Sequence, residues 1–152
     1  MATYNTSFSN ADGWGRPAFE VLDDYTMSVL LAGVTPPLGD PMSVTLANNQ
    51  TLAKYTVVGL DASGKLVKAT WNATAANAIK PIGVLAQAAQ SDATNSKGIR
   101  GLVYYSGCFN IDEKSVLVWD ASFDTEQKKH DAFVGSPAPC QIIARRRLAP
   151  TS

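Results

Sequence analysis

The side chains with the most reactive chemistry in this sequence are few and far apart. The single histidine is His130, and the two cysteines are Cys108 and Cys140. Nucleophilic catalysis needs a hydroxyl or thiol held beside a base, whereas a lone histidine in a charged helical segment is typical of a solvated surface residue. Two distant cysteines do not make a zinc site or a disulfide framework, so the sequence predicts two reduced core thiols.

Three carboxylates lie near one another in the sequence, at Asp120, Asp124 and Glu126. Such a group could bind a metal or act as an acid–base pair, but local roles explain it, because Asp120 is placed to end a strand and Asp124 to cap a helix. The sequence has no Walker loop, nucleophile elbow or dinucleotide fingerprint. We therefore expect no enzyme activity, no cofactor and no metal site.

The sharpest run of charge is formed by Arg145, Arg146 and Arg147. A solvated tail is the first interpretation of such a run, an acidic patch on a partner protein the second, and nucleic acid the third. Thirteen basic residues balance thirteen acidic ones, and the arginines have no aromatic residues between them, so we expect no direct binding to nucleic acid. The segment 145–152 is predicted to be a basic C-terminal tail, and its three arginines are candidates for binding a partner.

The membrane and the secretory route are also disfavoured. The longest apolar run, Val29–Val34, is far too short to cross a bilayer. Residues 1–10 contain no basic residue and no apolar run, so we expect no secretory signal.

Residues 1–42 differ in composition from the rest of the chain. Prolines and glycines interrupt this segment, which makes a compact sheet improbable there. It nevertheless carries more apolar side chains than a solvated linker does, so we predict an arm that folds onto a partner. The aromatic side chains that would make this contact are Tyr4, Phe8, Trp14 and Phe19.

From residue 43 the pattern changes to short strands separated by turn signals, which predicts a mainly β, α+β domain with a closed or nearly closed, barrel-like sheet. One short helix is predicted, capped by Asp124 with Gln127 completing a capping box, and stopped by Gly135 and Pro137. The predicted strands are 43–47, 54–60, 65–69, 82–86, 100–105, 108–111, 116–119 and 140–144.

Four stretches of the predicted domain, in the same order and at similar spacing, resemble the bacteriophage lambda head-decoration proteins. The second contains the Ile-Gly-Val-Leu-Ala core of a strand, the third a tyrosine followed by Ser-Gly-x-Phe, and the fourth a helix ending in Ala-Phe-x-Gly. The resemblance covers about residues 43–144, and its stretches are 60–69, 81–90, 103–111 and 124–135.

The resemblance implies a compact β-rich (β-tulip) domain that forms a homotrimer on the outer surface of the virion capsid, after assembly in the host cytoplasm. Trimers of this family sit at threefold and quasi-threefold positions of the expanded shell and clamp the major capsid protein against DNA pressure. The family's N-terminal arm orders on the shell by adding a strand to capsid-protein strands. This arm is longer than that of lambda, with Trp14 and Phe19 in it, and residues 145–152 have no counterpart there.

Three other functions remain open at this point. A tail or fibre module of the virion would show repeats or long shafts, and none is evident. A small-ligand-binding β-barrel or an unrecognised enzyme would respond to a ligand in a thermal-shift screen. A cell-surface adhesin is disfavoured by the expected lack of a secretory signal.

Overall fold

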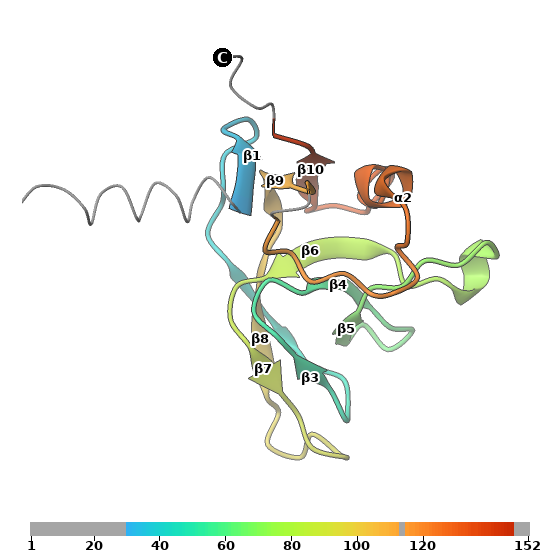
Figure 1. Cartoon of the computed structure of the whole chain (residues 1–152). Coiled ribbons are helices and arrows are strands. Elements are labelled where there is room, and N and C mark those ends of the chain that lie inside the picture. The colour runs from blue at the N-terminus through green and yellow to red at the C-terminus, as the bar shows by residue number, and fades with distance from the viewer. Residues whose placement is uncertain (1–29, 113–114, 148–152) are drawn as a thin grey trace, which may run out of the picture.

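The computed structural model describes residues 30–112 and 115–147, which form a mainly β domain with one short α-helix (Figure 1). The helix is α2 (Glu126–His130), and a single 3-10 turn, η1, spans Ala75–Asn77. The strands are β1 (Leu31–Gly33), β2 (Met42–Thr45), β3 (Thr51–Leu52), β4 (Val57–Leu60), β5 (Leu66–Lys68), β6 (Pro81–Leu85), β7 (Ala89–Gln90), β8 (Arg100–Tyr104), β9 (Ser106–Asn110) and β10 (Gln141–Arg145).

These strands form three sheets. The largest has the order β2-β8-β6-β4-β5 and is antiparallel throughout. A second sheet has the order β1-β9-β10, in which β10 runs parallel to β9 after a crossover that contains α2. β3 and β7 form a small two-stranded ribbon. Because only Tyr105 separates β8 from β9, one continuous stretch of chain links the two larger sheets.

The described residues contain no closed barrel, so the expectation of a closed sheet is wrong. Strand β2 ends the five-stranded sheet on one side and β5 on the other, and the two are joined only by the isolated bridge between Leu46 and Leu66. Apolar side chains instead gather in two clusters. One surrounds Phe109 and includes Phe123 and Phe133 from the loops on either side of α2, and the other surrounds Leu46 and Leu85.

Most predicted strands are present with shifts of one or two residues at their ends. The strand expected at 54–60 begins only at Val57, because Tyr55 has a left-handed backbone (φ 64°) that ends extended structure. The strand expected at 116–119 is not formed, since Val118 makes only an isolated bridge to Thr56. β1, in contrast, lies inside the segment where we judged a sheet improbable, and it pairs with β9.

The predicted helix is confirmed, but its cap is one residue later than expected. Thr125 has extended backbone angles and its hydroxyl accepts a hydrogen bond from the Lys128 amide at 3.3 Å, so Thr125 and not Asp124 is the N-cap. Asp124 instead forms an ion pair with Lys128 at 2.8 Å. The helix ends at His130, before the predicted stop at Gly135.

Glycine is required where β6 lies against β8 in the sheet. A methyl group on Gly83 would lie 2.3 Å from Val103 Cγ1 and 2.7 Å from the Tyr104 carbonyl oxygen. The glycine of the Ile-Gly-Val-Leu stretch therefore allows the two strands to approach closely. In the β4–β5 hairpin, Gly64 has a φ of 77°, a left-handed conformation that glycine adopts readily.

Candidate functional site

The four aromatic residues predicted to bind a partner lie outside the described residues. Tyr4, Phe8, Trp14 and Phe19 all precede Leu30, where the description begins.

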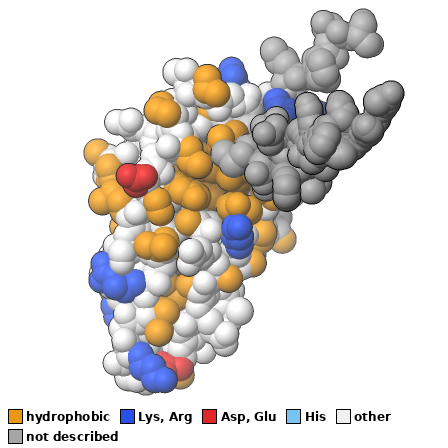
Figure 2. All heavy atoms as spheres, turned by 90° about the vertical axis from the view of Figure 1, so that its left-hand side faces the viewer, with side chains coloured by type: hydrophobic (Ala, Val, Ile, Leu, Met, Phe, Trp, Pro, Cys, Tyr) orange, Lys and Arg blue, Asp and Glu red, His pale blue; other side chains and the backbone are white. Residues whose placement is uncertain are grey.

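One face of the domain is largely apolar. Figure 2 shows hydrophobic side chains gathered on the side that lies to the left in Figure 1, where β1 and its connection to β2 run. In this connection Val34 is 83% exposed and Met42, at the start of β2, is 53% exposed. Residues 31–44 include one charged side chain, Asp40. Exposed apolar surface of this kind is typical of a protein contact.

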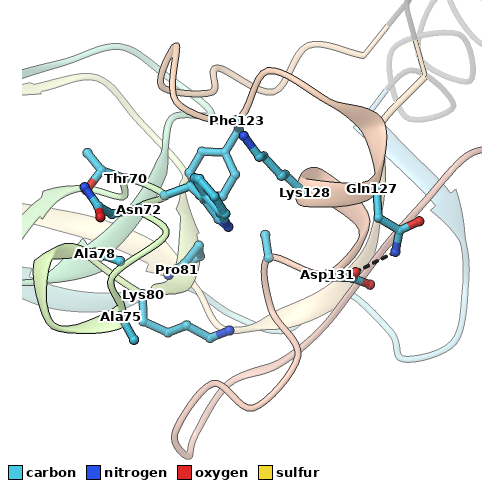
Figure 3. A pocket seen from close by; sticks show the side chains of 12 residues that line it. Thr70, Asn72, Ala75, Ala78, Lys80, Pro81, Phe123, Gln127, Lys128 and Asp131 are labelled. Carbon is cyan, nitrogen blue, oxygen red and sulfur yellow. Dashed lines mark hydrogen bonds between the residues drawn. The ribbon is translucent and has the colours of Figure 1, made fainter.

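A groove of about 410 Å³ lies between the loop after β5 and helix α2. Figure 3 shows Lys80 and Lys128 on opposite sides of it, with Phe123 beside the tip of Lys128. Trp71 in its wall is 40% exposed, which is unusual for so large an apolar side chain. The groove is lined by Thr70, Trp71, Asn72, Ala75, Ala78, Lys80, Pro81, Phe123, Gln127, Lys128, Asp131 and Ala132.

Hydrogen bonds to residues about fifty positions later in the chain hold the backbone of Trp71. The Trp71 amide donates to the Ser122 hydroxyl at 2.9 Å, and that hydroxyl donates to Asp120 at 2.7 Å. The Ser122 hydroxyl and amide hold the pKa of Asp120 below its usual range. The Lys128 ammonium lies 3.8 Å from the centre of the Trp71 ring, a cation–π contact. The tryptophan is thus held in place although it faces solvent.

The ionisable groups of the groove already have partners within the domain. Asp131 accepts hydrogen bonds from His130 and Gln127, which lower its pKa. Lys80 donates to the Val134 carbonyl, and the Lys128 ion pair lowers the pKa of Asp124. This arrangement provides an apolar floor with a satisfied polar rim, which suits contact with a protein surface.

The other reactive side chains are kept apart. Cys108 is buried and Cys140 half-buried, and the two do not pair; burial raises the pKa of the Cys140 thiol. His130 lies on the surface, as predicted, and contacts Asp131. Within residues 30–112 and 115–147, no three His, Cys, Asp or Glu side chains lie close enough to hold a metal ion. Asp120 and Asp124 have the separate local partners given above.

The structure divides the three arginines of the predicted tail. Arg145 is the last residue of β10, so it belongs to the folded sheet. Arg146 forms an ion pair with Glu126 at 3.0 Å. The Arg147 amide donates to the buried Asn110 side chain at 3.3 Å. The description ends at Arg147.

Sequence reasoning missed the groove. It did not single out Trp71, although an isolated tryptophan near polar residues is a signal for a contact surface. The opposite wall of the groove comes from residues 120–132, about fifty positions later in the chain. No local sequence pattern connects the two walls.

Comparison with known proteins identifies the chain. The family model described as "Bacteriophage lambda head decoration protein D" matches residues 28–141, about three quarters of the chain. The match begins earlier than the resemblance over 43–144 and takes in β1 and its connection to β2. A search of curated proteins found no match, and no helix within the described residues is long and apolar enough to cross a membrane. The chain therefore belongs to the bacteriophage lambda head decoration protein D family, which implies a structural virion protein that binds the outer surface of the phage capsid.

Proposed function

We propose that this protein binds as a homotrimer at the threefold and quasi-threefold positions of the expanded capsid and stabilises the shell against the pressure of packaged DNA. The observation that carries the proposal is the family match over residues 28–141. The partners are the major capsid protein and two further copies of this chain, with no direct contact to nucleic acid. Assembly takes place in the host cytoplasm.

The N-terminal arm is the proposed anchor on the shell. Residues 31–33 pair with β9 in the domain, so the anchoring part precedes Leu30. Its aromatic side chains, Tyr4, Phe8, Trp14 and Phe19, would fill pockets on the capsid protein, where a buried aromatic anchor contributes about 2 kcal/mol or more. Strand addition would supply main-chain hydrogen bonds.

Three arms on one trimer would bind by multivalency. Once one arm is bound, the next binds at a high effective concentration, which raises the affinity by roughly a hundredfold or more. The apolar face that contains Val34 and Met42 supports a protein-binding role, since it offers surface for contacts beyond the arm. Such a protein holds neighbouring capsid subunits together.

Binding should follow the state of the shell. Ordering a backbone residue costs roughly 1–2 kcal/mol, so an arm of some fifteen residues orders only where matching contacts exist. We expect those contacts on the expanded shell and not on the procapsid. Bound protein then favours the expanded form by its differential affinity, and decorated heads should withstand heat or osmotic shock better than bare heads.

The test mixes purified protein with procapsids and with expanded heads and counts the bound copies. We expect full occupancy on expanded heads and little on procapsids; equal occupancy would contradict the dependence on expansion. Sedimentation of the free protein should give a trimer, or a monomer that becomes trimeric on the shell. A stable dimer seated on a twofold axis would contradict the proposed symmetry.

Deletion of residues 1–15 tests the anchor. The domain should stay folded, because β1 and all later described strands remain, and its thermal melt serves as the control. Binding to expanded heads should fall by orders of magnitude, since three arms are lost together. If the shortened protein decorates heads as well as the full chain, the arm is not the anchor.

A further inference from the structure

The first described residues and the end of the last strand lie at the same end of the three-stranded sheet. Leu31 of β1 is paired with Phe109, and Arg145 of β10 is paired with Asn110, the final residue of β9. Figure 1 shows β1, β9 and β10 together. β1 and β10 are separated only by β9, a distance of about 10 Å at the usual strand spacing. The point where the arm joins the domain is therefore next to the arginines.

Arg145 has a guanidinium available for a partner. It projects from the exposed face of β10 and extends across β9 to β1, where a methyl group on Gly33 would lie 2.6 Å from its Nη2 atom. Among the described residues, this guanidinium has no hydrogen-bond or ion-pair partner. An arginine fork is suited to bidentate binding of a carboxylate.

Arg146, the next residue, already binds a carboxylate of its own chain. In its ion pair with Glu126, the Arg146 side chain is 55% exposed and the Glu126 side chain 48% exposed. Solvent and other molecules can therefore reach the pair. Beside the pair lies an open cavity of about 360 Å³. The cavity is lined by Ile111, Glu126, Gln127, His130, Arg145 and Arg146. The cavity borders Arg146 and part of Arg145, whose guanidinium lies away from it beside Gly33, and it is large enough for further acidic side chains.

We propose that this basic end, defined as Arg145, Arg146 and the cavity between β10 and α2, binds an acidic segment of the major capsid protein. The inference rests on the proposed function, because a shell-bound arm brings the basic end against the same surface. Carboxylates are the complementary groups for the two guanidiniums. Exposed ion pairs are weak alone, but they act here at the high effective concentration that the bound arm creates. Glu126 competes for Arg146 and so limits the strength of this contact.

The test compares full-length variants for binding to expanded heads at 50, 150 and 300 mM NaCl. Replacing both arginines (R145A/R146A) should weaken binding at 50 mM at least about tenfold, summed over three copies, and should flatten the dependence on salt. The matched control K65A/K97A also removes two cations, but from loops outside this end, and should bind as the wild type does. E126Q frees Arg146 and should bind about two- to threefold more tightly at 50 mM. Thermal melts show that each variant is folded.

The possible results distinguish a failure of the basic-end proposal from a failure of the proposed function. If the wild type binds neither kind of head, the decoration role fails and this inference fails with it. If the wild type binds and R145A/R146A keeps its affinity and salt dependence, only the basic end is contradicted. Fluorescence anisotropy with duplex DNA under the same salt conditions tests whether the arginines bind nucleic acid instead. Loss of DNA binding in R145A/R146A with unchanged binding to heads would assign the arginines to nucleic acid and overturn the proposal.

Discussion

Adding one methyl group at Gly83 should destabilise the domain measurably. The new Cβ would sit 2.3 Å from Val103 Cγ1 and 2.7 Å from the Tyr104 carbonyl oxygen, both far inside van der Waals contact. The second neighbour is backbone, so β6 and β8 must separate or shift to make room. Overpacking of this kind costs about 1–3 kcal/mol. For a domain of this size, the Gly83→Ala variant should melt roughly 2–12 °C below the wild type.

Gly39→Ala is the matched control, because it adds the same atom where the nearest neighbour, Ser106 Cβ, is an ordinary 3.4 Å away. It should be neutral or stabilise by up to about 1 kcal/mol through the unfolded state. In urea titrations, a Gly83→Ala and Val103→Ala double-mutant cycle should show a coupling of at least about 0.5 kcal/mol, since trimming Val103 removes one of the two clashes. If Gly83→Ala is as stable as Gly39→Ala, the close approach of β6 and β8 is wrong.

Two further predictions concern the core and the groove. Phe109→Ala should cost about 3–5 kcal/mol in urea unfolding, because this ring is fully buried in the cluster that includes Phe123 and Phe133, whereas Val34→Ala should stay within about 0.5 kcal/mol; equal costs would contradict the position of the core. The Ser122 hydrogen bonds lower the folded-state pKa of Asp120, so its stabilising contribution is complete above the ordinary pKa of about 3.9 and is lost as the pH falls through the lowered value. Between pH 5 and 3 the melting temperature of Asp120→Asn should therefore fall less than that of the wild type, and parallel curves would contradict this role.

The sequence predicted most of the local structure because local signals determine it. Short apolar runs between turn signals located the strands around Val58, Val84 and Val103. The capping-box pattern and the stop signals after it predicted α2. Its cap was misplaced by one residue because Asp124 and Thr125 can both cap a helix, and only the backbone angles of Thr125 decide between them.

The misses involve long-range pairing. β1 is three residues long in a segment rich in proline and glycine, and it becomes a strand only because β9 lies beside it. Whether strands close into a barrel depends on the pairing of sheet edges that are distant in sequence, which periodicity does not encode. The groove has the same origin, since Trp71 and Ser122 are 51 positions apart. Arg145 was assigned to a tail because a charged run hides the alternation that places it in β10.

The measurement that tests the proposed function most directly is a cryo-electron microscopy map of the mature virion that contains this protein. We expect density for three copies of the domain over each threefold and quasi-threefold position, on the outer surface of the shell. The end formed by the start of β1 and the end of β10 should face the capsid protein, with the arm continuing along it. Finding the chain in the tail, inside the shell or on twofold axes would contradict the proposal.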